Sequence, residues 1–456
     1  MTAAPQSARR LAHQVLERAV DRTIPPSRRL EELLGRSTLS PGDRGWATQM
    51  VHGVLRRQPT LDLVLKKYLQ RPLGQVEGGA LNWLRLAAYE LLFVPSTPSY
   101  AVLNETVNAA KQGGNPRWAG FLNGVLRSLT RDLTEEYQSW PAANTVPDDE
   151  GRYRVLKQAP FPDPVANPAD YLAAAFSLPA WLIARWTRRF SSEDLRAFGF
   201  WFNAPPRLSL RTNPLRTTRD ALLEALKERG VAAQPGQQPE AIVLERTTRV
   251  TELPGFAEGW FAVQDESAMA AARLLAPRPG ERVLDLCAAP GGKTTHLAQL
   301  MENRGEIVAV DVDIPRLSRV TEGCRRFGLE IVRCELLGRE AEELPVVGLD
   351  AILLDVPCSN TGVLGKRPEV RWRLQTRDLR ELTKIQSRLL GMALRGVRPG
   401  GRVVYSTCSL EPEENEELVR RVVQEQGGFQ IVRSQLHLPG RPGDGAFQCL
   451  LESSAR

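Results

Sequence analysis

The spacing of apolar residues divides the chain into a helical N-terminal part and a mixed C-terminal part. Between residues 7 and 133, five stretches repeat apolar residues at i, i+3, i+4 and i+7, which predicts amphipathic helices. These stretches cover residues 7–20, 46–69, 78–94, 100–112 and 117–133. Gly, Pro, Ser and Asn residues separate them, as at residues 95–98. We therefore predict an all-helical domain over residues 1–133.

The middle of the chain changes character twice. Residues 134–167 hold five prolines and six acidic against three basic residues, a composition typical of a linker. Predicted helices and strands then mix at 181–190, 207–213, 221–230, 241–246 and 260–264. We predict a small α/β module over residues 168–275, which connects the larger domains and binds RNA.

From residue 280 onward, apolar runs and amphipathic stretches alternate regularly. We predict strands at 282–287, 306–311, 330–334, 350–356 and 402–408, with helices at 293–301, 315–327, 379–397 and 413–426. Apolar strands joined by helices predict a mostly parallel sheet with helices on both faces, within a domain over residues 276–456. In such sheets the ligand binds beyond the carboxyl ends of the strands.

Polar and reactive residues follow these predicted strands. The first strand leads into a glycine-rich turn before a helix, a place where backbone can approach an anion; the turn consists of Cys287, Ala288, Ala289, Pro290, Gly291, Gly292 and Lys293. The turn resembles the end of a phosphate-binding P-loop, but the first glycine of that motif would fall on Cys287. The acid after the second strand, Asp311, suits either ribose hydroxyls or a helix N-cap, for which Asp313 is the better candidate.

Two cysteines stand in polar turns after neighbouring strands. Cys358 follows the fourth predicted strand, close to Asp355, and Cys408 follows the fifth. A lone cysteine is usually a small buried apolar residue, and we assign Cys324 and Cys449 to that class. Cys358 and Cys408 gain nothing by packing in a polar turn, so we expect them to converge on the ligand cleft.

Charge and cysteine usage narrow the class of protein. The net charge is +7, and residues 1–133 alone carry 18 basic against 10 acidic residues. This excess is typical of a segment that binds a polyanion, although 52 of the 60 basic residues are Arg, which a GC-rich genome also produces. The six cysteines include no C-x-x-C pair, which argues against a disulfide framework or a metal site. Without a long apolar run or a secretory signal, we expect a cytoplasmic protein with no membrane contact.

Three motifs carry a family resemblance. They read Asp-Leu-Cys-Ala-Ala-Pro-Gly-Gly-Lys-Thr, Asp-Val-Pro-Cys-Ser-Asn-Thr-Gly and Thr-Cys-Ser-x-x-Pro-Glu-Glu-Asn, starting at residues 285, 355 and 407. Together they resemble the motifs of RNA 5-methylcytosine methyltransferases, which use S-adenosylmethionine on a Rossmann-like fold. Nearly the whole chain resembles the bacterial RsmB (Sun/Fmu) family of 16S ribosomal RNA methyltransferases, with an N-terminus similar to the NusB-type RNA-binding fold. The alternative for the N-terminal helices is an ordinary helical bundle with a structural role.

The resemblance implies roles for residues of this chain. Cys408 would add to C6 of a cytosine as the nucleophile, and Cys358 would assist product release. The reverse assignment is the alternative, because cytosine DNA methyltransferases use the thiol of a Pro-Cys pair as nucleophile. Asp355 would bind either the base edge or the cofactor. The turn 287–293 and Asp311 would bind the cofactor, and Glu335 would replace the third-strand acid of the family pattern Gly-Asp-Gly. Arg367 stands where the family often has His.

The implied partner is 16S ribosomal RNA, free or in an early assembly state, with no role for DNA and with the protein as a monomer. The same chemistry on transfer RNA is an alternative, and a non-catalytic RNA-binding assembly factor is a second one, against which the cysteine pair argues. Residues 366–388, with eight basic and three acidic residues, form either a phosphate clamp or a solvated helix face.

Overall fold

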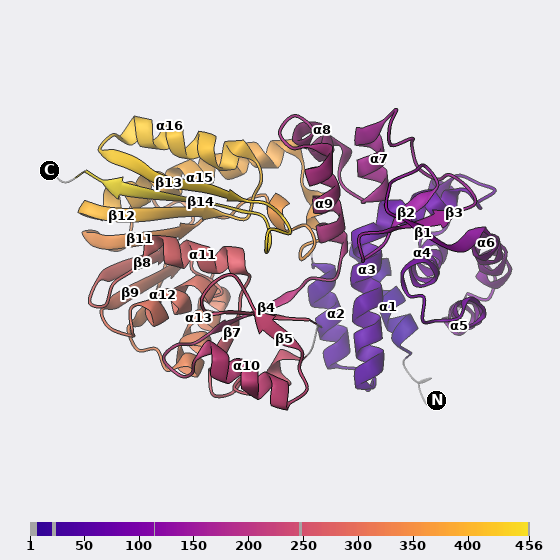
Figure 1. The fold of residues 1–456 in the computed structure, drawn as a ribbon, viewed down its shortest axis with the longest axis horizontal. Helices are drawn as coiled ribbons and strands as arrows, with labels where there is room; N and C mark the ends of the chain where they lie inside the picture. Colours follow the sequence, from indigo (N-terminus) through magenta and orange to yellow (C-terminus); the bar gives the residue numbers. More distant parts are fainter. Residues whose placement is uncertain (1–6, 21–23, 114, 246–248, 455–456) are drawn as a thin grey trace. The chain divides into compact units, whose positions relative to one another are not determined.

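The computed structural model of the protein describes residues 7–20, 24–113, 115–245 and 249–454. The chain forms two compact units (Figure 1). Unit 1 comprises Met1–Pro205 together with the segment Leu364–Arg373, and unit 2 comprises Pro206–Val363 and Leu374–Arg456. A ten-residue piece of the C-terminal half of the sequence therefore belongs to the N-terminal unit.

Helices dominate the first part of unit 1, as the apolar spacing predicts. They are α1 (Ala8–Glu17), α2 (Pro26–Gly35), α3 (Pro41–Lys66), α4 (Gly78–Phe93), α5 (Ser99–Gln112) and α6 (Trp118–Asp132). Helix α4 is buried along most of its length and forms the centre of the bundle. It packs closely on α3 because Gly53 leaves room for Tyr89; a Cβ at Gly53 would lie 2.0 Å from the Tyr89 ring.

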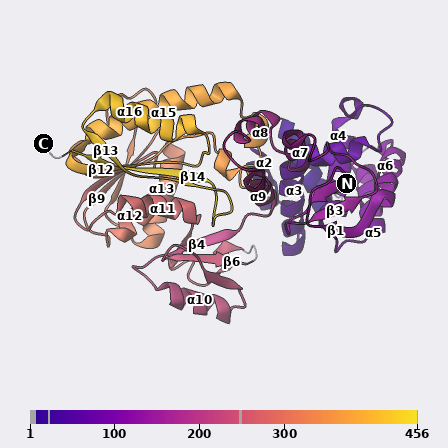
Figure 2. The same cartoon turned by 45° about the horizontal axis from the view of Figure 1, so that its top comes forward.

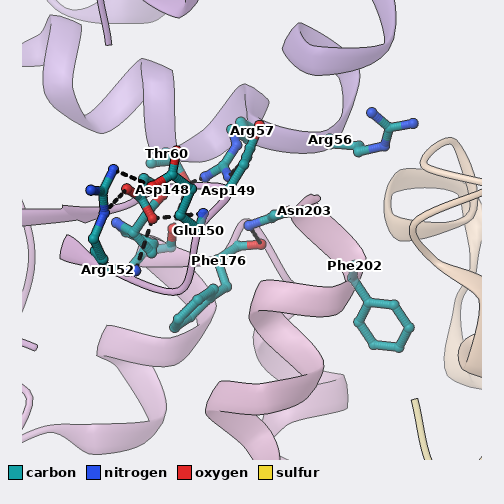
Figure 3. A network of polar contacts seen from close by, with 12 residues as sticks. Arg56, Arg57, Thr60, Asp148, Asp149, Glu150, Arg152, Phe176, Phe202 and Asn203 are labelled. Atoms are coloured by element: carbon teal, nitrogen blue, oxygen red, sulfur yellow. Dashed lines mark hydrogen bonds and ion pairs between the residues drawn. The ribbon is translucent and has the colours of Figure 1, made fainter. Parts of the chain in front are cut away.

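The segment predicted as a linker is folded, which corrects that part of the prediction. It holds the antiparallel strands β1 (Leu133–Gln138), β2 (Thr145–Pro147) and β3 (Tyr153–Leu156), in the order β1-β3-β2. The acidic residues that suggested a solvated linker have partners, because the buried Arg57 of α3 pairs with Asp149 and Asp148 pairs with Arg152 (Figure 3). Pairing with a distant arginine is a tertiary interaction that composition does not report.

The next three helices also belong to unit 1, so the predicted start of the small module at residue 168 differs from the boundary in the structure. These helices are α7 (Pro168–Ala175), α8 (Ala180–Trp186) and α9 (Ser192–Asn203). The buried Thr60 hydroxyl of α3 contacts the Ser177 hydroxyl at 2.6 Å, and Trp186 packs edge-on against Phe198. These contacts join α7–α9 to the helical bundle.

Arg371 holds the inserted segment Leu364–Arg373 in unit 1. Its guanidinium donates to the Arg56 carbonyl at 2.6 Å, the Phe202 carbonyl at 2.6 Å and Asn203 Oδ1 at 2.8 Å. Figure 3 shows Phe202 and Asn203 of α9 beside the helix that carries Arg56. Arg371 is buried and committed to these acceptors. It therefore does not contribute to the predicted phosphate clamp over residues 366–388.

Unit 2 contains a large sheet, part of which is labelled in Figure 2. Seven strands form it, in the order β10-β9-β8-β11-β12-β14-β13. Its strands are β8 (Arg282–Leu286), β9 (Glu306–Asp311), β10 (Val332–Leu336), β11 (Leu349–Asp355), β12 (Val397–Thr407), β13 (Phe429–His437) and β14 (Ala446–Ser453). The first five pair in parallel, as predicted, whereas β14 runs antiparallel to both β12 and β13. The two C-terminal strands were not predicted.

Helices cover both faces of this sheet. They are α11 (Glu266–Leu275), α12 (Gly292–Leu300), α13 (Ile314–Phe327), α15 (Thr376–Gly396) and α16 (Glu416–Gln426). The short α14 (Val370–Arg373) belongs to the inserted segment of unit 1. Leucines and valines of α15 and α16 form one apolar core with the sheet, and residues of α11, α12 and α13 form a second core on the other face. This is the predicted two-sided arrangement.

A smaller sheet precedes the large one within unit 2. Its strands are β4 (Leu208–Thr212), β5 (Ala233–Pro235), β6 (Ala241–Leu244) and β7 (Phe261–Val263), in the order β5-β6-β4-β7, and α10 (Arg219–Glu228) packs on it. The predicted strands 207–213, 241–246 and 260–264 correspond to β4, β6 and β7, except that Arg246 lies outside the described residues.

Candidate active site

The carboxyl ends of four neighbouring strands meet at one edge of the large sheet. Leu286 at the end of β8 pairs with Val310 of β9 and with Leu354 of β11. One residue further along, Asp355 pairs with Ser406 of β12. The turns that follow these strands carry the predicted site residues, so the sheet register brings them to a common edge.

The turn after β8 is tied to the neighbouring strand. The Ala288 amide donates to the Val310 carbonyl at 2.9 Å, and the Ala289 amide donates to Asp311 Oδ2 at 3.1 Å. Cys287 adopts a left-handed φ of 65° and Gly291 one of 101°. A Cβ at Gly291 would lie 3.0 Å from the Val320 Cα, so the turn requires glycine there.

Asp311 is buried and does not cap the helix that follows it. Asp313 does so instead, because its carboxylate accepts the Arg316 amide at 2.9 Å. The choice left open by the sequence is thereby decided: Asp313 is the N-cap, and Asp311 faces the turn after β8.

A third carboxylate lies beneath this turn and was not among the predicted site residues. Asp285 is fully buried, accepts the Thr294 hydroxyl at 2.6 Å through Oδ2, and has no described hydrogen bond at Oδ1. Burial raises the pKa of Asp285 to about 7. The only sequence signal for it was an acid at the end of the first strand.

Lys293 forms an ion pair with Asp355, with 2.7 Å between Nζ and Oδ2. Burial lowers the pKa of Lys293, but the Asp355 charge outweighs this effect and the net shift is upward. Electrostatic attraction to Cys408 adds to the increase. Lys293 is thus a permanent cation bound to the end of β11, which differs from the phosphate-binding lysine of a P-loop.

The two predicted cysteines converge. The Sγ atoms of Cys358 and Cys408 lie 3.2 Å apart, and both thiols are free. Asn360 joins the pair by accepting from Cys408 Sγ at 3.1 Å and donating to the Cys358 carbonyl at 2.7 Å. Its left-handed φ of 61° suits asparagine and was not recognised in the sequence. The hydrogen bond to Cys408 and then burial raise the pKa of Cys358.

A buried carboxylate lies next to this pair. Glu414 accepts hydrogen bonds from Ser359 and Ser409, the residues that directly follow the two cysteines. Glu414 is part of the motif beginning at residue 407, but no sequence signal separated it from its neighbours.

Among the described residues, no side-chain hydrogen bond or ion pair links Glu335 with these groups. It lies on β10, and its carboxylate pairs with Arg333 two residues earlier on the same strand. Asp311, Asp355 and Asp285 all act electrostatically on Cys287. A cofactor-binding role for Glu335 remains a prediction.

The small sheet contributes one more residue next to the cofactor turn. Arg211 of β4 is buried and donates to the Gly292 carbonyl at 2.6 Å and to the Thr295 hydroxyl at 2.9 Å. Burial lowers the pKa of Arg211 to about 9. It was not predicted, since nothing in the sequence links β4 to the start of α12.

The parallel sheet with a glycine-rich turn and acids at its edge defines a Rossmann-like domain, and comparison with known families identifies its activity. Residues 272–443 match the family described as 16S rRNA methyltransferase RsmB/F. Residues 6–131 match the NusB family, and residues 178–251 match the ferredoxin-like domain of RsmF/B-like methyltransferases. The fold is thus a methyltransferase domain combined with a NusB-like and a ferredoxin-like domain.

Known proteins match over nearly the whole chain. A Synechocystis protein named probable ribosomal RNA small subunit methyltransferase B is 34% identical, covering 92% of this chain and 89% of its own. The ribosomal RNA small subunit methyltransferase B of Salmonella paratyphi B is 33% identical, with coverages of 97% and 98%. The solved structure of PH0851 has a TM-score of 0.76 at 26% identity, covering 99% of this chain and 100% of its own. The chain belongs to the RsmB/F family of 16S rRNA methyltransferases.

Family membership confirms S-adenosylmethionine as the cofactor, and the edge of the sheet fits it. The ligand brings ribose hydroxyls and cationic groups, which suit the carboxylates of Asp311 and Asp355 and the orphaned oxygen of Asp285. The backbone of the turn 287–293 can approach it closely at Gly291. Within the described ranges, no helix is long and apolar enough to span a membrane, and no cluster of His, Cys, Asp or Glu is arranged to hold a metal ion.

Proposed function

We propose that this protein methylates C5 of a cytosine in 16S ribosomal RNA through a covalent bond between Cys408 and C6 of the base. The observation that carries the proposal is the contact of two free thiols at 3.2 Å, at the strand ends beside the cofactor turn. A methyl transfer to oxygen or to an amino nitrogen has no use for a pair of thiols. Methyl transfer to cytosine C5 does need a thiol, because C5 is a weak nucleophile until a thiolate adds at C6.

The proposed reaction has three steps, which are addition to the base, methyl transfer and elimination. The Cys408 thiolate forms a bond to C6, the C5=C6 double bond opens, and C5 gains the electron pair. Bound S-adenosylmethionine would supply the methyl group to C5, and its sulfur would keep the bonding electron pair and leave as neutral S-adenosylhomocysteine. Loss of the C5 proton to solvent water then restores the double bond and expels Cys408, whose departing sulfur receives the proton of the Cys358 thiol.

The environments of the two cysteines support this division of roles. Cys358 is buried, and its raised pKa favours the protonated thiol. Cys408 is more exposed, and the Lys293 ammonium interacts with it electrostatically. The buried thiol suits an acid–base partner, and the more accessible cysteine beside a cation suits a nucleophile.

Asp355 has one free acceptor for either of its proposed roles. Its Oδ2 is bound to Lys293, and its Oδ1 has no hydrogen bond among the described residues. We propose that this oxygen binds the cytosine amino edge or the cofactor. The target cytosine must leave its stack to reach the thiols, so an unpaired nucleotide is the expected substrate.

The NusB-like domain would supply the general affinity for RNA. Residues 1–133 carry a net charge of +8, and the exposed residues among them include Lys66, Lys67, Arg117 and Arg127. Phosphate contacts position an RNA without reading its sequence. We propose free or early-assembly 16S ribosomal RNA as the substrate and a monomer as the active form.

The two cysteines should fail differently when replaced. The variant Cys408→Ala should abolish methylation and form no covalent complex with RNA. In the variant Cys358→Ala, Cys408 should still add to the base, and the base should still receive the methyl group. Protein should then accumulate on methylated RNA as a denaturant-resistant band. If Cys408→Ala is the variant that traps RNA, the nucleophile is Cys358.

Bisulfite sequencing of RNA from a deletion strain identifies the substrate. Loss of one 5-methylcytosine in 16S ribosomal RNA is the expected result. Loss of a site in transfer RNA would instead support the alternative substrate. An unchanged pattern in both RNAs would support a non-catalytic role in assembly and contradict the proposal.

A further inference from the structure

Glu414 is a buried carboxylate whose hydrogen-bond partners are all neutral. It closes the short helical turn Pro412–Glu414 and has no exposed surface. Among the described residues, no Lys, Arg or His forms an ion pair with it. Burying a carboxylate without a cation is costly, so this position needs several donors to be tolerated.

The donors come from the turns that carry the two thiols. Glu414 Oε1 accepts the Ser359 amide at 2.9 Å, and Oε2 accepts the Ser359 hydroxyl and, at 2.5 Å, the Ser409 hydroxyl. The two hydroxyls also contact each other at 3.0 Å. Since Ser359 follows Cys358 and Ser409 follows Cys408, one carboxylate ties both cysteine turns together.

Further contacts hold the carboxylate itself in place. Gln386 of α15 donates to Glu414 Oε1 at 2.9 Å and to the Pro357 carbonyl at 2.9 Å. The Tyr405 hydroxyl donates to the Glu414 carbonyl at 2.7 Å. We call the bonds from Glu414 to Ser359 and Ser409 the carboxylate clamp. This clamp is supported by α15, on one face of the sheet, and by β12.

We propose that Glu414 is the positioning residue of the thiol pair, and that its bonds to Ser359 and Ser409 hold the Cys358 and Cys408 turns at contact distance. This inference rests on the proposed function for its catalytic meaning. A carboxylate is required because three bonds from the two turns end on its oxygens. Glutamine offers only one acceptor oxygen, and its amide nitrogen would face donors.

The charge of Glu414 has a second consequence at Cys358. The pKa of Cys358 is raised mainly by its hydrogen bond to Cys408 and by burial, and the negative charges of Cys408 and Glu414 add to this. The other titratable groups nearby are Tyr405, which interacts with Cys358 and Glu414, and Lys293, which interacts with Cys408. Removing the Glu414 charge therefore makes Cys358 easier to ionise.

The test compares Glu414→Gln with Glu417→Gln in the full-length protein. Glu417 is exposed on α16, so its variant makes the same change of charge away from the site. Misplacing a reacting group by about 1 Å costs about 10²-fold in rate. We expect Glu414→Gln to lower the single-turnover rate of adduct formation by about 10²-fold while S-adenosylmethionine affinity, measured by calorimetry, stays within about 2-fold.

A pH profile separates positioning from a merely structural effect. Turnover that needs a protonated Cys358 falls at alkaline pH, and this fall should begin at lower pH in Glu414→Gln than in wild type. Adduct formation at the wild-type rate in Glu414→Gln, or an unshifted alkaline limb, would overturn the proposal. Joint loss of cofactor binding and folding would also overturn it, by showing a general structural role.

A measurement without RNA keeps the inference separate from the proposed function. In a glutathione redox buffer, glutathione disulfide oxidises the two thiols to a disulfide and is reduced to two glutathiones. The equilibrium, read by mass spectrometry, reports how closely the thiols are held. The equilibrium constant for forming the Cys358–Cys408 disulfide should fall by about tenfold in Glu414→Gln and also in the milder variant Ser409→Ala. Equal equilibrium constants in wild type and both variants would refute the carboxylate clamp. A wild-type protein that forms no RNA adduct refutes the proposed function instead.

Discussion

Replacing Arg371 should destabilise unit 1 more than replacing any exposed arginine of the same segment. The Arg371 guanidinium is the donor to three short bonds, with the Arg56 and Phe202 carbonyls and with Asn203 Oδ1. These acceptors belong to α3 and α9, which are far apart in the sequence. The Arg371 side chain thus provides the hydrogen bonds that water gives these three acceptors in the unfolded chain.

The size of the effect follows from opposing terms. Each buried acceptor left without a donor costs about 1–3 kcal/mol, so three of them set an upper bound of about 9 kcal/mol. Burial and the charges of Arg56 and Arg57 lower the pKa of Arg371, so removing this buried cation returns part of that cost. We expect Arg371→Ala to lower the free energy of unfolding by about 3–5 kcal/mol.

Guanidinium denaturation followed by tryptophan fluorescence measures this effect. Eight of the nine tryptophans lie in unit 1, so the signal reports mainly on that unit. Arg367→Ala is the control, because Arg367 is exposed in the same segment. A loss below about 1 kcal/mol in Arg371→Ala would refute the argument, since it would mean that water satisfies the three acceptors equally well.

Three further predictions concern the cofactor, pH and RNA. Asp311→Asn should weaken S-adenosylmethionine binding by one to two decades in calorimetry, because a hydrogen bond to a charged group contributes about 1.5–3 kcal/mol; unchanged affinity would remove Asp311 from the site. The raised pKa of Asp285, about 7, means that the folded state binds more protons than the unfolded state between about pH 4 and 7. The free energy of unfolding should therefore fall as the pH rises from about 4 to 7, and this fall should be smaller in Asp285→Asn. The same pH dependence in both proteins would contradict the raised pKa of Asp285. Alanine replacement of exposed Lys and Arg within residues 1–133 should weaken RNA binding and reduce its salt slope by roughly 0.7–0.9 per lost phosphate contact. An unaltered slope would make that domain structural only.

The sequence determined the elements that local pattern controls. Apolar spacing alone predicted α1, α3, α4, α5 and α6 but missed α2. The alternation after residue 280 predicted the five parallel strands with their order along the chain. The convergence of Cys358 and Cys408 was also predictable, because parallel strands bring their carboxyl ends to one edge whatever their neighbours are. The motifs then added chemistry to that edge.

Only the tertiary structure decided where charged residues find their partners. The acids of 134–167 suggested a linker until Arg57 was seen to pair with Asp149. In the basic segment 366–388, predicted as a phosphate clamp or a solvated helix face, only the structure showed that Arg371 is buried and bonded within unit 1. Glu414 lay in a recognised motif, but its proposed role follows from its hydrogen bonds with Ser359, which lies 55 residues earlier in the chain. Sequence patterns record the period of burial along one element, whereas the partner of a buried charge is set by which distant elements fold against it.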